Sequence, residues 1–168
     1  MMSQSARSAI TLSVLALLLL VAAIWGWSAA TSPLPAKVDT PLCVTRAVAA
    51  GDKIYPQDVT VSVYNAGTRE GLAGRVMQSF QDAGFAEGSS GNATGAKVPV
   101  VQIWTDQPKS PAVLLTASRL GGDVAIERRD GLGVGVTVVV GDGFTGLTKG
   151  PAGIVVKEDT EICSPPVA

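Results

Sequence analysis

Hydrophobic and polar positions change their period once within residues 59–85. Valines alternate with polar residues from Val59 to Val63, the period of two that is typical of a half-buried strand. Past a polar turn, apolar residues recur every four positions from Leu72 to Phe80, which gives a helix one apolar face. Gly84 stands where a glycine commonly ends a helix. The stretch therefore predicts a strand, a tight turn and an amphipathic helix, which together form half of a packed α/β layer.

Similar patterns continue towards the C-terminus. Further strands are predicted at three segments: Pro99–Trp104, Asp123–Arg129 and Val134–Val140. A second helix is expected between the first two, with Ser110 as its N-cap and Pro111 at its first position. Its inner face is predicted to comprise Val113, Leu114, Ala117 and Leu120. Residues 86–97 are rich in glycine and serine, so we expect a flexible loop there. The order β-α-β-α-β-β predicts an α/β fold, a small α+β-like sandwich with two helices packed on one sheet.

The N-terminal segment has a different composition. No charged residue occurs from Ala9 to Ala30, and about 20 apolar residues at a rise of about 1.5 Å span a hydrocarbon core of about 30 Å. We expect a retained single-pass signal anchor in the cytoplasmic membrane, with Arg7 and the N-terminus inside. A cleavable signal peptide is the alternative, because Ser28-Ala29-Ala30 resembles a processing site. The predicted organisation is a cytoplasmic N-terminus (1–8), a transmembrane helix (9–30), a linker (31–42) and an extracytoplasmic domain (43–168, core 58–148).

The chain has two cysteines, Cys43 and Cys163, one near each end of the predicted extracytoplasmic domain. In an oxidising compartment we expect them to form an intramolecular disulfide that joins the two ends of the domain. Two free thiols, or pairing with another chain, are the alternatives. A short edge strand is expected at Val44–Val48, and one more strand at Ile154–Val156 in the C-terminal tail.

Charge and composition weigh against several classes of function. Lys and Arg number 13 and Asp and Glu 14, a net charge of −1 that offers no attraction to nucleic acid. The chain contains no histidine, the commonest general base and metal ligand in proteins. No serine, threonine or cysteine has a recognisable base partner. We therefore expect no enzyme activity, no cofactor and no metal.

The turn between the first strand and the first helix is the strongest candidate site. Five of its residues are candidates for binding: Asn65, Gly67, Thr68, Arg69 and Gly71. Backbone N–H groups at a helix N-terminus attract anions, which suits a phosphate, a carboxylate or an acidic wall group. The alternative, which we favour, is local: Asn65 and Gly67 form the turn, and Thr68 or Glu70 caps the helix.

Two other polar clusters receive structural interpretations. Asp142, between Gly141 and Gly143, suits a turn after a strand better than a metal or phosphate site, because a lone carboxylate supplies too few ligands. Arg128-Arg129-Asp130 at a strand end is expected to be a solvated rim, with contact to an anionic polymer as the alternative.

Four sequence blocks carry a resemblance to a known family: Val61–Gly67, Gly71–Ala73, Ala83–Phe85 and Val138–Phe144. They comprise a strand that ends in an Asn-x-Gly turn, a Gly-Leu-Ala helix start, an Ala-Gly-Phe helix end and a valine-rich strand that ends in Gly-Asp-x-Phe. In this order they resemble the LytR C-terminal domain family over about residues 58–148. Stand-alone, membrane-anchored members are similar to actinobacterial cell-envelope integrity proteins of the Cei type.

The resemblance implies a function in the cell envelope. In that family the domain often follows a LytR-CpsA-Psr catalytic domain, which attaches glycopolymers to peptidoglycan, whereas here only the predicted linker separates anchor and domain. The leading hypothesis is a non-catalytic adaptor that supports envelope integrity or assembly through contacts with other membrane or envelope proteins. The alternative is a module that binds cell-wall glycan or peptidoglycan.

Overall fold

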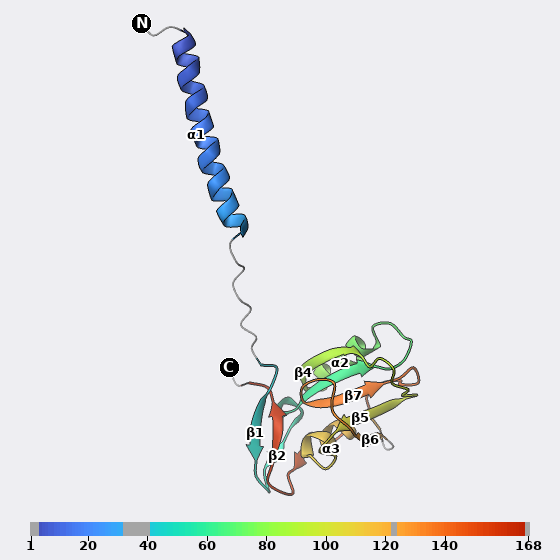
Figure 1. The fold of residues 1–168 in the computed structure, drawn as a ribbon. Coiled ribbons are helices and arrows are strands. Elements are labelled where there is room, and N and C mark those ends of the chain that lie inside the picture. Colours follow the sequence, from blue (N-terminus) through green and yellow to red (C-terminus); the bar gives the residue numbers. More distant parts are fainter. Residues whose placement is uncertain (1–3, 32–40, 122–123, 167–168) are drawn as a thin grey trace. The chain divides into compact units, whose positions relative to one another are not determined.

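The structure is a computed structural model that describes residues 4–31, 41–121 and 124–166, and it divides into two compact units, Met1–Asp39 and Thr40–Ala168. The first unit contains helix α1 (Gln4–Thr31), drawn in blue in Figure 1. Within it, Ile10–Ser28 is long and apolar enough to cross a membrane. The predicted transmembrane helix is therefore present as a helix of suitable length and composition. Most of the predicted linker lies outside the described residues.

The second unit is built on a five-stranded sheet with the strand order β4-β3-β7-β5-β6. The strands are β3 (Thr60–Asn65), β4 (Ala86–Asn92), β5 (Val101–Thr105), β6 (Ala125–Arg128) and β7 (Val136–Val140). Strand β3 runs parallel to β4 and β7, while β5 runs parallel to β6 and antiparallel to β7. Helix α2 (Leu72–Asp82) connects β3 to β4, and helix α3 (Pro111–Ala117) connects β5 to β6. The α/β fold with two helices and one sheet is confirmed.

Both helices cover the same face of the sheet. The inward valines of β3 and β7 share one hydrophobic cluster with the apolar faces of α2 and α3. Helix α2 buries the side chains that its four-residue period predicts: Leu72, Ala73, Val76, Met77 and Phe80. Phe80 packs edge-on against Phe85 just past the helix end, with ring centroids 5.3 Å apart. Gly84 adopts φ +90°, as a helix-terminating glycine does.

The predicted inner face of α3 is partly wrong. Leu114 is 45% exposed, whereas its neighbour Leu115 is fully buried. The helix ends at Ala117, so Leu120 is buried from beyond the helix rather than from its face. A helix of seven residues has only two turns, so the position of its first residue decides which leucine faces inward. Ser110 occupies the N-cap position as predicted, but its side chain makes no capping hydrogen bond.

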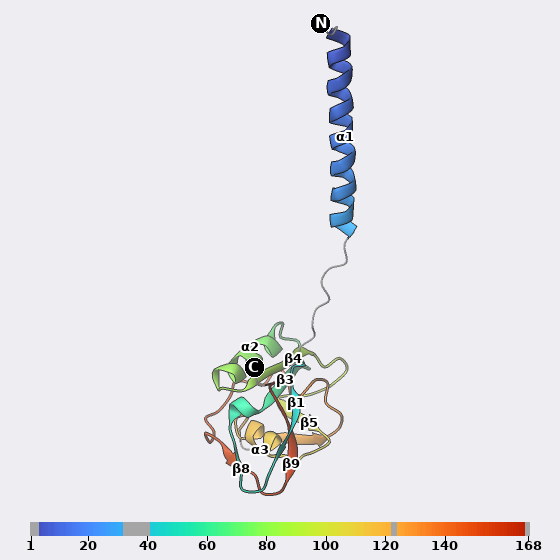
Figure 2. The ribbon, with the colours of Figure 1, turned by 90° about the vertical axis from the view of Figure 1, so that its left-hand side faces the viewer.

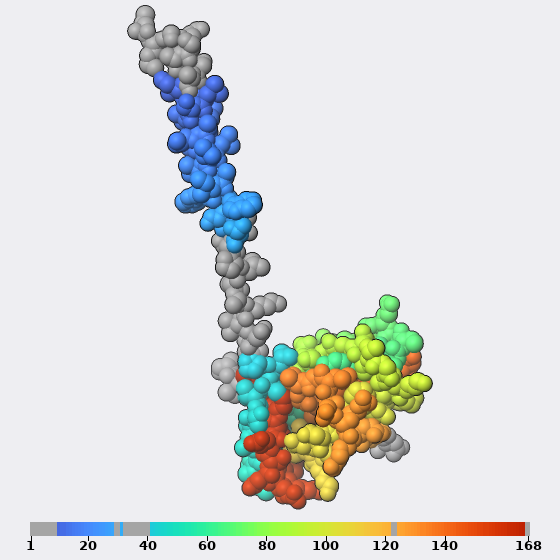
Figure 3. Space-filling model, viewed as in Figure 1, coloured from blue at the N-terminus to red at the C-terminus, as the bar shows by residue number. Residues whose placement is uncertain are grey.

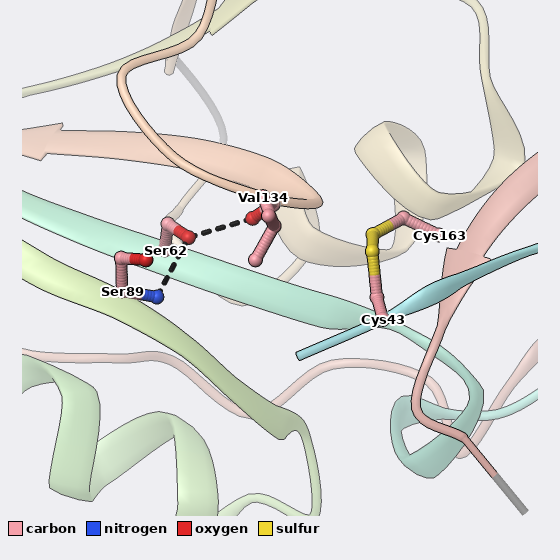
Figure 4. The surroundings of a disulfide bond; sticks show 5 residues. All are labelled: Cys43, Ser62, Ser89, Val134 and Cys163. Atoms are coloured by element: carbon pink, nitrogen blue, oxygen red, sulfur yellow. Dashed lines mark hydrogen bonds between the residues drawn. A yellow bond between two sulfur atoms is a disulfide. The ribbon is translucent and has the colours of Figure 1, made fainter. Parts of the chain in front are cut away.

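Most of the predicted flexible loop is a strand instead. Residues 86–92 form β4, which pairs with β3 through a register shift at which Ser62 lies opposite two residues. The Ser62 hydroxyl accepts a hydrogen bond from the Ser89 N–H (2.9 Å) and donates to the Val134 carbonyl (2.6 Å), as Figure 4 shows. Gly88 lies against this hydroxyl, and a Cβ there would come within 2.5 Å of it. Gly88 is therefore required by the β-bulge, and the segment pairs as a strand instead of forming a loop.

The two ends of the second unit form separate short ladders beside the main sheet. Strand β1 (Val44–Val48) pairs antiparallel with β9 (Thr160–Ser164), and β2 (Lys53–Ile54) with β8 (Ile154–Val155). Figure 2 shows β1 and β9 side by side. A disulfide joins Cys43 to Cys163, with Cα atoms 5.5 Å apart (Figure 4). The predicted disulfide and the predicted strand at 44–48 are confirmed, while β2 and β9 were not predicted.

Candidate functional site

Asn65 shapes the turn between β3 and α2. Its side-chain oxygen accepts a hydrogen bond from the Gly67 N–H at 2.9 Å, and its side-chain nitrogen donates to the Arg69 carbonyl at 2.9 Å. The side chain is buried, so these two bonds satisfy its polar atoms out of water. The local interpretation, in which Asn65 and Gly67 form a turn, is confirmed.

The backbone of this turn binds a carboxylate that belongs to the chain itself, that of Asp142. The Thr68 N–H donates to both oxygens of Asp142, at 2.8 and 3.0 Å, and the Thr68 hydroxyl donates at 3.0 Å. The Arg69 N–H adds a fourth bond at 3.1 Å. A Cβ at Gly67 would collide with the same carboxylate, so glycine is needed for this close approach. We call this arrangement of the turn and Asp142 the carboxylate clasp.

Electrostatics favour the charged form of Asp142 within the clasp. The Thr68 backbone N–H that donates to Asp142 holds the pKa of that carboxyl below its ordinary value, and the Arg69 N–H, the Thr68 hydroxyl and the Arg69 charge act in the same direction. Partial desolvation opposes them. The folded clasp therefore contains a carboxylate anion at neutral pH.

The Arg69 guanidinium is also used within the chain. Its Nη1 donates to the carbonyl oxygens of Asp142 at 3.3 Å and Phe144 at 3.1 Å. Arg69, a candidate for binding an external anion, thus fixes the segment that supplies the internal carboxylate. Gly141 closes the same segment by accepting a hydrogen bond from the Phe144 N–H at 3.1 Å, which confirms the predicted turn after β7.

The predicted capping of α2 is wrong. Gly71 is the N-cap, with φ +67°, and it has no side chain with which to cap the helix. Thr68 directs its hydroxyl at Asp142 instead of at the helix. Thr68 was predicted to cap the helix because it lies just before it in the sequence. Its hydroxyl instead donates to Asp142, which lies 74 residues further along the chain.

The five predicted binding residues therefore lie together on one turn, and two of them, Thr68 and Arg69, donate hydrogen bonds to Asp142. That any of them binds an external ligand stays a prediction. Sequence reasoning treated the turn and the Gly-Asp-Gly segment as separate candidates. The signal that links them is topological: β3 and β7 are parallel neighbours in which Asn65 lies opposite Val140, so the segments that follow both strands meet at one edge of the sheet.

The basic segment at the end of β6 is exposed, as expected for a solvated rim. Arg129 has a contact that the sequence did not indicate, because its guanidinium lies 3.8 Å from the centre of the Trp104 ring. Trp104 is buried on the sheet face opposite the helices, where it packs in a second, smaller hydrophobic cluster. Among the described residues, no group of three or more acidic or cysteine side chains is arranged to hold a metal ion.

These features define a small α/β domain with an internal carboxylate clasp, on a chain that also carries one helix of membrane-spanning length. The family described as LytR cell envelope-related transcriptional attenuator matches residues 58–144, which are 87 of the 168 residues. The chain belongs to this family. The matched segment runs from the residues before β3 to Phe144 and so includes both halves of the clasp.

One solved structure is similar to the chain. It is the soluble domain of a conserved hypothetical secreted protein (Rv2700 ortholog) from Mycobacterium marinum, with 20% sequence identity and a TM-score of 0.42, covering 60% of this chain and 77% of that one. A likeness at this level bears on neither mechanism nor partners. No curated protein matches the sequence at a significant level.

Proposed function

We propose that this chain is a non-catalytic, membrane-tethered module of the cell envelope, whose domain contacts other envelope proteins during envelope assembly or maintenance. The observation that carries the proposal is the family match over the whole helix-bearing core of the domain. The apolar helix α1 supplies a single-pass anchor, with the N-terminus inside and the domain outside the cytoplasm.

The carboxylate clasp supports contact with proteins over binding of an anionic ligand. The Thr68 and Arg69 backbone donors and the Arg69 guanidinium already have partners within the chain. An external phosphate or acidic glycan at this turn would have to displace Asp142, which is held by four hydrogen bonds. A turn fixed in this way is better suited to present a rigid surface to a partner.

Site-specific photo-crosslinking in intact cells tests the proposal. A photoreactive residue replaces Glu70, which is exposed beside the clasp. The matched control replaces exposed Lys97, in the loop before β5. Capture of the same envelope protein from Glu70, with little or none from Lys97, is the expected result. Failure to recover any envelope protein from positions across the domain would contradict the proposal.

Binding to purified sacculi distinguishes the glycan alternative. We expect the domain not to sediment with sacculi, and Arg69→Ala to leave that result unchanged. Sedimentation that Arg69→Ala abolishes would replace the adaptor proposal with a wall-binding module.

Protease treatment of spheroplasts checks the orientation, since the domain should be digested from outside while the membrane stays closed.

A further inference from the structure

The chain contains two Asp-Gly dipeptides, Asp130-Gly131 before β7 and Asp142-Gly143 after it. In such a dipeptide the backbone nitrogen of the glycine can attack the side-chain carboxyl carbon of the aspartate, because glycine has no side chain to hinder the approach. Figure 3 shows orange surface, the colour of the stretch that holds both dipeptides, exposed on the domain. The shared dipeptide gives both positions a similar intrinsic reactivity, so a large difference between them has to come from the fold.

The fold holds both reacting groups of Asp142-Gly143 in place. The Asp142 carboxylate receives four hydrogen bonds from Thr68 and Arg69 in the carboxylate clasp. The Gly143 N–H donates to the Pro99 carbonyl at 2.9 Å. Attack of the Gly143 nitrogen on the carboxyl carbon therefore requires the clasp to open and the bond to Pro99 to break.

Neither reacting group of Asp130-Gly131 is held in this way. Both residues are exposed, in the irregular segment between β6 and β7. Within the part of the chain that the structure describes, no hydrogen bond or ion pair reaches the Asp130 carboxylate, and the Gly131 N–H has no acceptor. The hydrogen-bonded part of the segment begins at the next residue, where the Tyr64 hydroxyl donates to the Leu132 carbonyl at 2.8 Å. The Asp130 side chain can therefore rotate towards the Gly131 nitrogen without loss of a hydrogen bond.

We propose that Asp130 is a site of spontaneous conversion to isoaspartate in the folded protein, whereas Asp142 is protected by the clasp. In the first step the Gly131 nitrogen loses its proton and bonds to Cγ of the Asp130 side chain in its acid form. The Cγ–OH bond breaks, and the hydroxide leaves with that proton as water, so the product is a succinimide ring. Addition of water to the Cγ carbonyl restores aspartate, whereas addition to the former backbone carbonyl makes the main chain continue through Cγ, as isoaspartate. This chemistry needs no redox reagent and no partner, so it is independent of the proposed function.

The modification would act on the segment that covers the sheet face opposite the helices. Residues 131–135 lie so close to the sheet that a Cβ at Gly131 would stand 2.6 Å from the Thr137 hydroxyl, and one at Gly133 would stand 2.7 Å from the Tyr64 hydroxyl. Isoaspartate lengthens the main chain at residue 130 by one methylene group. The glycines that follow cannot all keep these positions, so we expect the segment to move away from the sheet.

Mass spectrometry of the full chain, incubated in nanodiscs at neutral pH, tests the proposal. Cleavage after lysine releases residues 110–149 as one peptide that contains both aspartates, and electron-transfer fragmentation distinguishes isoaspartate from aspartate at each position. Isoaspartate should accumulate at residue 130 at least about thirtyfold faster than at residue 142, because several hydrogen bonds of the clasp have to break before Asp142 reacts. In guanidinium the two rates should converge, because the unfolded chain has no clasp.

Two variants serve as matched controls. Asp130→Glu keeps the charge but would have to close a larger, less favourable ring, so it should abolish the modification at residue 130 and leave residue 142 unchanged. Gly67→Ala places a Cβ against the Asp142 carboxylate and should raise the rate at residue 142 at least about fivefold, with residue 130 unchanged. Hydrogen exchange of the β7 amides checks that Gly67→Ala keeps the sheet.

Two results would overturn the inference. The first is a folded chain that stays unmodified at residue 130 over a time in which the unfolded chain reacts at both positions. The second is a folded chain in which residues 130 and 142 react at equal rates. Amides of residues 131–135 that exchange no faster in the isoaspartate form would refute the expected movement of the segment.

Discussion

Replacement of both disulfide cysteines by serine should destabilise the second unit through its unfolded state. The bond joins Cys43 to Cys163 across 120 positions, nearly the full length of the unit. In the chain-entropy treatment, the loss of loop-closure entropy for a loop of this size corresponds to about 5 kcal/mol at 25 °C. Domains of this size are stable by about 5–15 kcal/mol in total, so the bond contributes a third or more of the stability.

Urea unfolding of residues 40–168, followed by tryptophan fluorescence, measures the effect. Trp104 is the single tryptophan of this unit and is 3% exposed, so its emission reports loss of the folded sheet. With a slope of about 2 kcal/mol per molar urea, the midpoint of the Cys43→Ser, Cys163→Ser variant should fall by about 2.5 M. Reduction of the unmodified domain by a phosphine should give the same curve, because it removes the same constraint.

Two results would refute this reasoning. A midpoint that falls by less than about 0.5 M, with an unchanged slope, would mean that the unfolded chain is not measurably restricted by the bond. The second result is a loss of amide protection that is confined to β1 and β9, together with an unchanged Trp104 transition. It would show that the bond stabilises only the ladder between β1 and β9.

Three further predictions concern the core, the bulge and the clasp. Phe80→Ala should lower the free energy of unfolding, measured in urea, by about 3–5 kcal/mol, because the ring is fully buried. Gln78→Ala on the exposed face of α2 should change that free energy by no more than about 0.5 kcal/mol. Gly88→Ala should lower the free energy of unfolding by about 1–3 kcal/mol, because the added Cβ would collide with the Ser62 hydroxyl at the bulge. Gly74→Ala has open space around it in α2 and should raise the free energy of unfolding by up to about 1 kcal/mol. Equal effects of the two substitutions would refute the bulge argument. The carboxylate form of Asp142 is the bound form, so its stabilisation is fully present above its ordinary pKa of 3.8 and is lost as the pH falls through the lower folded-state pKa. An NMR titration of the neighbouring backbone amides should therefore have its midpoint below 3.8 and disappear in Asp142→Asn, and a midpoint at or above 3.8 would contradict the clasp.

Local patterns predicted the elements that local physics determines. The two-residue period from Val59 and the four-residue period from Leu72 each arise within one element, and both elements form where expected. The disulfide was predictable because only two cysteines exist and both lie outside the apolar segment. The α/β class followed from the order of these elements.

The errors arose where a distant segment decides the local structure. Ser62 and the Val134 carbonyl stabilise β4 around its bulge, so a glycine- and serine-rich sequence becomes a strand that its own composition does not favour. Thr68 donates to Asp142, 74 residues later, instead of capping the next helix. The candidate turn was correctly located, but its carboxylate partner depends on strand order, which local periodicity does not contain.

The Cys43–Cys163 bond also determines how the domain bears load. Any pull transmitted from the N-terminal unit arrives first at Cys43, where the chain branches covalently into β1 and, through the disulfide, into β9. The force is therefore shared by both strands of the terminal ladder, and β1 is not peeled away from β9 one hydrogen bond at a time. Without the bond, tension would open that ladder from its end. The disulfide therefore bears the load at the point where the chain enters the domain. A force on the N-terminal segment is then not transmitted as unfolding of the five-stranded sheet.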